Sequence, residues 1–279
     1  MISNNTIWQR LISKSSVPNF YKGIKNIQFS YFKSKIDNND YNFQEELINY
    51  IFDGYVIQFE NALDNELIEF IKSEALKLSR LNVSNKCECI QGVNNYFYLQ
   101  KDDQSVNGGY KAIDRSYYFF PWDKSSSELF DKINNYWSYI KHLGGQDKDE
   151  YNNNQPKDGI INRVHIIQYL TGGGTISPHN DPYDYQRIQI GSVMSEFGKD
   201  YKKGGFCSFD DKKRKIYLEP QLKKGSLVCF FPSMIHSVDP IDSEEKLSFD
   251  EKSGRWYLSL GSVGSAHLKN RKKSNAVNI

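Results

Sequence analysis

The residues best suited to carry chemistry lie at the end of the stretch HIIQYLTGGGTISPHND, residues 165–181. It reads as a strand, a glycine-rich turn, and a second strand that ends in His179, Asn180 and Asp181. Because side chains alternate between the two faces of a strand, His179 and Asp181 point the same way and Asn180 points away. An imidazole and a carboxylate are two of the three ligands of a 2-His-1-carboxylate iron site. The third should be a distant histidine, and His236 in GSLVCFFPSMIHSVDP meets that requirement.

A cation for the carboxylate of a co-substrate follows later in the chain. Arg255 opens the strand-like run GRWYLSLGSV, and a guanidinium can hold a carboxylate through two hydrogen bonds. Tyr257 and Ser259 share its strand face and could add hydroxyl donors. Lys246 and Lys252, in the loop before Arg255, remain alternatives for this role.

These residues, in this order, resemble the Fe(II)/2-oxoglutarate-dependent oxygenase family over roughly the last 120 residues of the chain. The resemblance implies that His179, Asp181 and His236 bind iron and that Arg255 holds 2-oxoglutarate. It also implies three cofactors or co-substrates: Fe(II), 2-oxoglutarate and O2. Members that halogenate have a small residue where this chain has Asp181, so the resemblance implies hydroxylation or a related oxidation.

Several other residues are candidates for the pocket. Relatives of the prolyl-hydroxylase type often place a tyrosine at the co-substrate in the position of Tyr169, which can equally be a core aromatic residue. His165 alternates onto the same face as Tyr169 and lines the pocket or is structural. Tyr257 departs from the serine or threonine that many relatives have two residues after the arginine. Substrate contacts are expected among five polar residues that otherwise read as surface or salt-bridged: Arg115, Arg163, Asp184, Tyr185 and Arg187.

The second half of the chain must position these residues on strands. From Ile160 onward, clusters of Pro, Gly, Asp and Lys separate short apolar runs, which favours a β-sandwich or barrel. The predicted strands are 161–170, 175–179, 187–197, 205–209, 214–219, 226–231, 234–239 and 255–263. The resemblance narrows this to a double-stranded β-helix, or jelly roll, so the fold class is mainly β with bracing helices.

The first half of the chain predicts the bracing elements. Apolar residues at helical spacing predict helices over 43–53, 65–80 and 125–143, with Asp64 as the N-cap of the second. Strands are predicted over 55–59, 96–99 and 116–120, and residues 1–42 are predicted as an extended arm or short helices. We therefore expect one domain: a mixed α/β bracing region over 1–159, the jelly-roll core over 160–265, and a solvated basic tail over 266–279.

Composition restricts the setting and the partners. The 279 residues carry a formal net charge of +2, which is too balanced for a nucleic-acid or membrane surface. Neither Cys87 and Cys89 nor Cys207 and Cys229 form a CxxC zinc motif. The first 16 residues contain no long apolar run, and no run approaches a membrane span, so we expect no secretory signal and a reducing, cytoplasmic location.

These observations predict an oxygenase that oxidises an unactivated C–H bond of a small polar substrate. A free amino acid or an amino-acid-derived metabolite is favoured, because the chain has no appended recognition domain and has arginines near the expected site. Three alternatives remain: a prolyl-type hydroxylase of protein side chains, a metal oxidase that uses no 2-oxoglutarate, and a non-catalytic jelly-roll binding module. Nucleic-acid demethylation is disfavoured by the charge.

Overall fold

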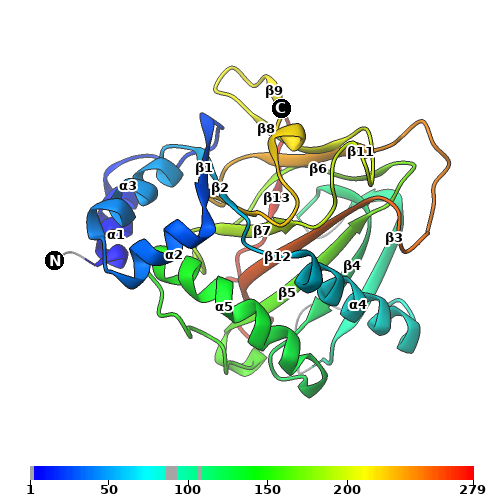
Figure 1. Ribbon diagram of the computed structural model, residues 1–279, viewed down its shortest axis with the longest axis horizontal. Coiled ribbons are helices and arrows are strands. Elements are labelled where there is room, and N and C mark those ends of the chain that lie inside the picture. The colour runs from blue at the N-terminus through cyan, green and yellow to red at the C-terminus, as the bar shows by residue number, and fades with distance from the viewer. Residues whose placement is uncertain (1–2, 86–92, 106–107) are drawn as a thin grey trace.

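A computed structural model describes residues 3–85, 93–105 and 108–279 (Figure 1). Cys87 and Cys89 lie outside the described residues. The helices are α1 (Asn4–Lys14), α2 (Phe29–Asp37), α3 (Tyr41–Phe52), α4 (Asn65–Leu81) and α5 (Ser127–Leu143). The strands are β1 (Gly23–Gln28), β2 (Tyr55–Glu60), β3 (Tyr96–Ser105), β4 (Lys111–Phe119), β5 (Ile160–Tyr169), β6 (Gly174–Asn180), β7 (Gln189–Val193), β8 (Gly205–Phe209), β9 (Lys215–Tyr217), β10 (Leu227–Phe230), β11 (His236–Ile241), β12 (Arg255–Gly264) and β13 (Asn275–Ala276). Three short 3-10 turns are η1 (Lys124–Ser126), η2 (Pro156–Asp158) and η3 (Glu219–Gln221).

Within the described residues, all strands belong to one curled sheet with the order β1-β2-β10-β7-β12-β5-β4-β6-β11-β8-β9. Strand β4 forms the corner of this sheet. Its residues 115–119 pair with β5, and its residues Ala112 and Ile113 pair with β6. One wall therefore consists of β1, β2, β10, β7, β12, β5 and β4, in that order across the sheet. The facing wall consists of β6, β11, β8 and β9. This is the mainly β, jelly-roll fold predicted from the sequence.

The helices cover the outer face of the larger wall, where α2, α4 and α5 lie side by side in Figure 1. Alternation along the strands explains how one sheet serves both a core and a site. On β5, Val164 and Ile166 face outward into the helix-covered core. Trp256 and Leu258 of β12 do the same, which leaves the intervening residues of both strands facing the opposite wall.

Local sequence signals place the bracing helices correctly. The Asp64 side chain accepts a hydrogen bond from the backbone N–H of Leu67 at 2.8 Å, as expected of an N-cap. Helices α3 and α5 also occur where helical spacing predicts them. None of the helices in the described part of the chain has the length and apolarity needed to cross a membrane.

Residues 1–42 contain more regular structure than the sequence indicates. Strand β1 pairs in parallel with β2 and extends the larger wall, while α1 buries Trp8 completely. The indole N–H of Trp8 donates to the carbonyl of Leu143 at 2.9 Å, so the segment is fixed to the end of α5. These contacts are all remote in sequence, and a local pattern does not reveal them.

The C-terminal segment is not a solvated tail, and this corrects the expectation from its basic composition. Residues Asn275 and Ala276 of β13 pair with Asn180 and His179 of β6. The backbone N–H of Val277 donates to Pro178 at 3.0 Å. Lysines such as Lys272 keep their side chains in solvent, but the backbone follows an otherwise open sheet edge because that edge offers unpaired hydrogen-bonding groups.

Candidate metal and co-substrate site

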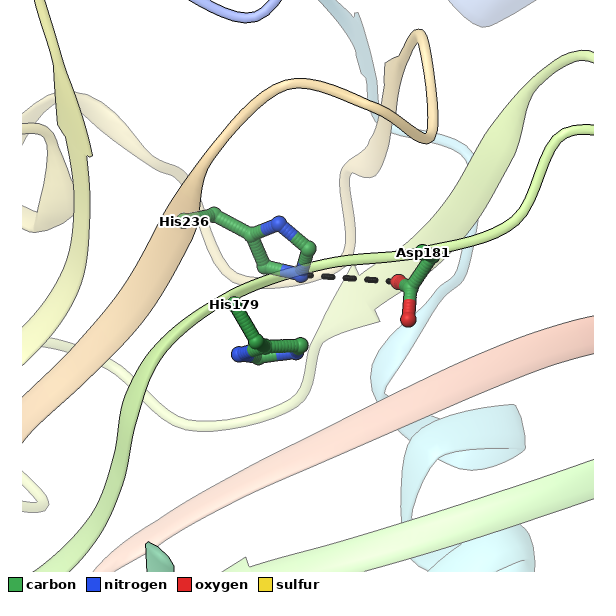
Figure 2. Close-up of side chains that lie close together, drawn as sticks. All are labelled: His179, Asp181 and His236. Atoms are coloured by element: carbon green, nitrogen blue, oxygen red, sulfur yellow. Dashed lines mark ion pairs between the residues drawn. The ribbon is translucent and has the colours of Figure 1, made fainter. Parts of the chain in front are cut away.

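His179, Asp181 and His236 converge at one point between the two walls (Figure 2). His179 on β6 and His236 on β11 are directly paired across the antiparallel ladder, and Asp181 lies just beyond the end of β6. One potential ligand atom from each residue lies within 4.8 Å of the others. The Nε2 of His236 is 3.6 Å from Oδ2 of Asp181. This is the close grouping of two imidazoles and a carboxylate that the spacing predicted.

Both imidazoles are oriented by main-chain carbonyls. The Nδ1 of His179 lies 2.9 Å from the carbonyl oxygen of Ser177, and the Nδ1 of His236 lies 2.9 Å from that of Met234. Because a carbonyl only accepts, each Nδ1 carries the hydrogen and each Nε2 keeps a lone pair. Burial, together with the neighbouring His179, lowers the pKa of His236 and keeps its ring neutral. These rings are therefore in the form that binds a metal ion.

Asp181 is also held in place. Its backbone N–H donates to the carbonyl of Pro232 at 2.9 Å. Its Oδ1 accepts a hydrogen bond of 2.5 Å from the hydroxyl of Ser274, while Oδ2 faces His236. Two imidazole nitrogens and one carboxylate oxygen, each fixed by a second contact, form a donor set that fits Fe(II).

A cavity of about 300 Å³ opens beside this cluster. Strands of both walls line it, and so does the C-terminal segment from Arg271 to Ser274. On β5 the inward residues Arg163, His165, Ile167 and Tyr169 all line it. The cavity also includes Arg255, Tyr257 and Ser259 of β12 and Tyr185 of the loop after Asp181.

Arg255 lies at one end of the cavity and is almost fully buried, with 1% of its surface exposed. Its Nε donates to Oε1 of Glu219 at 2.8 Å, and Glu219 is itself buried. The guanidinium carbon lies 4.9 Å from the ring centre of Tyr257 and 5.6 Å from that of Tyr169. The Nη2 atom is buried and has no hydrogen-bond partner among the described residues. A buried guanidinium N–H without a partner is costly, so this atom is suited to receive an anion.

The surroundings of Arg255 keep its hydroxyl neighbours neutral. Burial raises the pKa of Tyr257 and of Tyr169 above the ordinary tyrosine value. Glu219 is fixed by the Tyr201 hydroxyl and the Phe206 backbone N–H, which both donate to it. A carboxylate that reached Arg255 would therefore meet one cation and two neutral hydroxyl donors.

The structure separates the remaining candidates into two groups. Tyr169, Tyr257, Ser259, His165, Arg163 and Tyr185 line the cavity. Five candidates do not. Arg115 points from the opposite face of β4 to Gln168 and the carbonyl of Phe249, and Arg187 donates to Asn5 of α1 at 2.7 Å. Asp184 is exposed in the loop after Asp181, and Lys246 and Lys252 likewise lie outside the cavity lining.

Sequence reasoning missed several residues that shape the site. Glu219 lies in η3, and no spacing relates it to Arg255, so only the folded structure pairs them. Ser274 falls in a segment read as solvent-exposed. The sequence contained a signal for Asp114 and Ser116, because residues two positions apart on a strand lie on the same face.

No family model matches the sequence, and no curated protein matches it. Among solved structures, the chain is similar to a full-length Neurospora crassa protein in complex with alpha-KG. The identity is 13%, the alignment covers 86% of this chain and 85% of that one, and the TM-score is 0.52. A C-terminally truncated apo form of the same protein gives 14% identity, coverage of 89% and 99%, and a TM-score of 0.52.

These likenesses establish the fold. The chain has a double-stranded β-helix with bracing helices, which confirms the fold class predicted from the sequence. Between its two walls it carries the His-Asp-His cluster described above.

Proposed function

We propose that this chain is an Fe(II)- and 2-oxoglutarate-dependent oxygenase that acts on a small polar substrate. One arrangement carries the proposal: the ligand atoms of His179, Asp181 and His236 converge on the cavity in which Arg255 presents a buried, unpartnered Nη2 among the described residues. A metal site and an anion site in one cavity are what a chelating keto acid with a second carboxylate requires. The similarity of fold to a protein solved with alpha-KG supports this assignment.

Each residue has a physical task in the proposed site. His179, Asp181 and His236 would hold Fe(II) through two Nε2 atoms and a carboxylate oxygen, and the bound iron would supply the activation of O2. Arg255 would hold the distal carboxylate of 2-oxoglutarate. Tyr169 and Tyr257 would add neutral hydroxyl donors, while their rings and Ile167 exclude water from that end of the cavity.

Glu219 acts as a positioning residue in this proposal. Its carboxylate fixes the Nε of Arg255, and Nη2 remains without a partner among the described residues. It also neutralises the buried guanidinium, because Arg255 would otherwise be an isolated charge with 1% exposure. The pair leaves one edge of Arg255 available for a carboxylate.

The substrate we propose is a free amino acid or an amino-acid-derived metabolite. A cavity of about 300 Å³ is at the lower end of the range for small-molecule sites. Its walls are polar beyond the metal cluster, with Ser116, His165 and Arg163 facing inward. The C-terminal segment forms part of its lining, which supports an enclosed small molecule over a protein chain held in an open groove.

The direct test is succinate release by the Fe(II)-loaded protein given 2-oxoglutarate and air. We expect turnover in the wild type and its loss in His179→Ala, with iron content falling in parallel. His267→Ala is the matched control, because His267 is exposed and lies outside the cavity lining. Iron binding without succinate would contradict the proposal in favour of an oxidase that uses no 2-oxoglutarate. No iron binding would leave a non-catalytic binding module.

A further inference from the structure

A second polar network lines the same cavity, on β4 and β5. The Nε2 of His165 is 2.9 Å from the hydroxyl oxygen of Ser116, and that hydroxyl is 2.6 Å from Oδ1 of Asp114. A carboxylate only accepts, so Ser116 donates to Asp114, and its oxygen then accepts from the Nε2–H of His165. Burial lowers the pKa of His165 well below its ordinary value, so the ring is neutral and the network ends in one charged group.

Asp114 is a buried carboxylate without a counter-charge among the described residues. It is 8% exposed, and its side chain accepts the hydrogen bond from the neutral hydroxyl of Ser116. Arg255, which pairs with Tyr169 between β12 and β5, forms its ion pair with Glu219. Burial raises the pKa of the Asp114 carboxyl to about 6, and no cation in the described part of the chain offsets this rise. Burying such a carboxylate lowers the free energy of unfolding unless a bound ligand supplies a positive charge.

The cavity around Asp114 suits a cationic nitrogen. Tyr98 and Tyr110 line it together with Asp114, and aromatic faces attract ammonium groups. The Tyr110 ring stacks on the imidazole of His179 with 4.8 Å between ring centres. Tyr110 therefore lies beside a metal ligand and lines the same cavity as Asp114.

We propose that Asp114, oriented by the hydrogen bond from Ser116, binds a positively charged amino group of the substrate beside Tyr98 and Tyr110. This inference rests on the proposed function and makes it more specific: the substrate is an amine. An ammonium group on Asp114 would leave the rest of the molecule in the cavity that the metal cluster also lines.

The inference separates compounds that differ in one charge. We would measure thermal shifts of the Mn(II)- and 2-oxoglutarate-loaded protein with each of the free amino acids and with its N-acetyl derivative. Acetylation removes the positive charge and keeps the side chain. Wild type is expected to bind at least one amino acid 10-fold or more tightly than its N-acetyl form. Asp114→Asn, which keeps the shape and can still accept from Ser116, is expected to lose that preference.

Two further variants make the result specific. Ser116→Ala keeps the carboxylate, so the preference for the amine is expected to persist even if binding weakens. Asp184→Asn removes an exposed carboxylate outside the cavity lining and is expected to match the wild type. The inference is overturned if no free amino acid is preferred over its N-acetyl form, or if Asp114→Asn retains the wild-type preference.

The failure of the proposed function would look different. The thermal shift caused by Mn(II) and 2-oxoglutarate alone, without any amine, reports on the metal and co-substrate site. Its absence from the wild type would refute the proposed function. Its presence, with no discrimination between amines and their acetylated forms, would refute the role of Asp114 and leave the oxygenase assignment standing.

Discussion

The buried pair of Arg255 and Glu219 gives the most demanding test of the proposed co-substrate site. Both side chains are 1% exposed, with 2.8 Å between Arg255 Nε and Glu219 Oε1. Replacing Arg255 by Met leaves a buried carboxylate without its cation, so we expect a loss of about 3–5 kcal/mol in the free energy of unfolding. Adding Glu219→Gln removes that charge and is expected to recover most of the loss, to within about 1–2 kcal/mol of wild type, because the amide oxygen can still accept from Tyr201 or Phe206.

Binding of 2-oxoglutarate is expected to respond differently from stability. Both the single and the double variant lack the guanidinium, so the distal carboxylate loses its charge-assisted hydrogen bonds in each. Loss of these hydrogen bonds is expected to weaken the binding free energy of 2-oxoglutarate by about 3 kcal/mol, which lowers the affinity about 100-fold. Urea denaturation gives the stabilities, and calorimetric titration of 2-oxoglutarate into the Mn(II)-loaded protein gives the affinities.

A surface pair serves as the matched control. Arg214 contacts Asp210 at 2.6 Å, but its side chain is 69% exposed, so Arg214→Met is expected to cost less than about 1 kcal/mol. A stability loss in Arg255→Met no larger than this would refute the argument from burial. Wild-type affinity for 2-oxoglutarate in the double variant would refute the role of Arg255 and favour a different anion site.

Three further outcomes are expected. Ser274→Ala removes the hydrogen bond to Asp181 and is expected to weaken metal binding by about 10-fold or more, measured by Mn(II) titration against Ser265→Ala as control. Asp114→Asn is expected to become more stable than wild type as pH rises from 4 to 7. Below the ordinary carboxyl pKa of 3.8, Asp114 is protonated in both the folded and the unfolded wild type. Above the folded pKa of about 6, ionisation of Asp114 has lowered the free energy of unfolding of the wild type by about 3 kcal/mol. Denaturation curves at pH 4 and pH 7 check this, and an unchanged difference would contradict it. Metal at about 100 times its dissociation constant is expected to stabilise the protein by about 2.7 kcal/mol, and a chelator is expected to reverse this stabilisation while leaving His179→Ala unaffected.

Local patterns were sufficient for helices α3, α4 and α5 and for most strands of the second half. Helix α4 illustrates this, because an N-cap, an amphipathic spacing and a length of four to five turns all lie within one short segment. Strand β1 shows the opposite case. Its alternation is weak, and it exists as a strand because β2 lies beside it. A parallel pairing between segments about 30 residues apart leaves no signal in either segment alone.

The sequence by itself determined which side chains share a face. The period of a strand places His179 with Asp181 and Arg255 with Tyr257, because that alternation is a property of the local backbone. Only the tertiary structure decided what lies opposite each face. The β6–β11 register brings His236 to His179, the position of η3 brings Glu219 to Arg255, and docking of the C-terminal segment brings Ser274 to Asp181. Pairings between distant segments depend on how whole strands align. The alignment of β4 with its neighbours likewise decides that no cation among the described residues offsets the burial of Asp114.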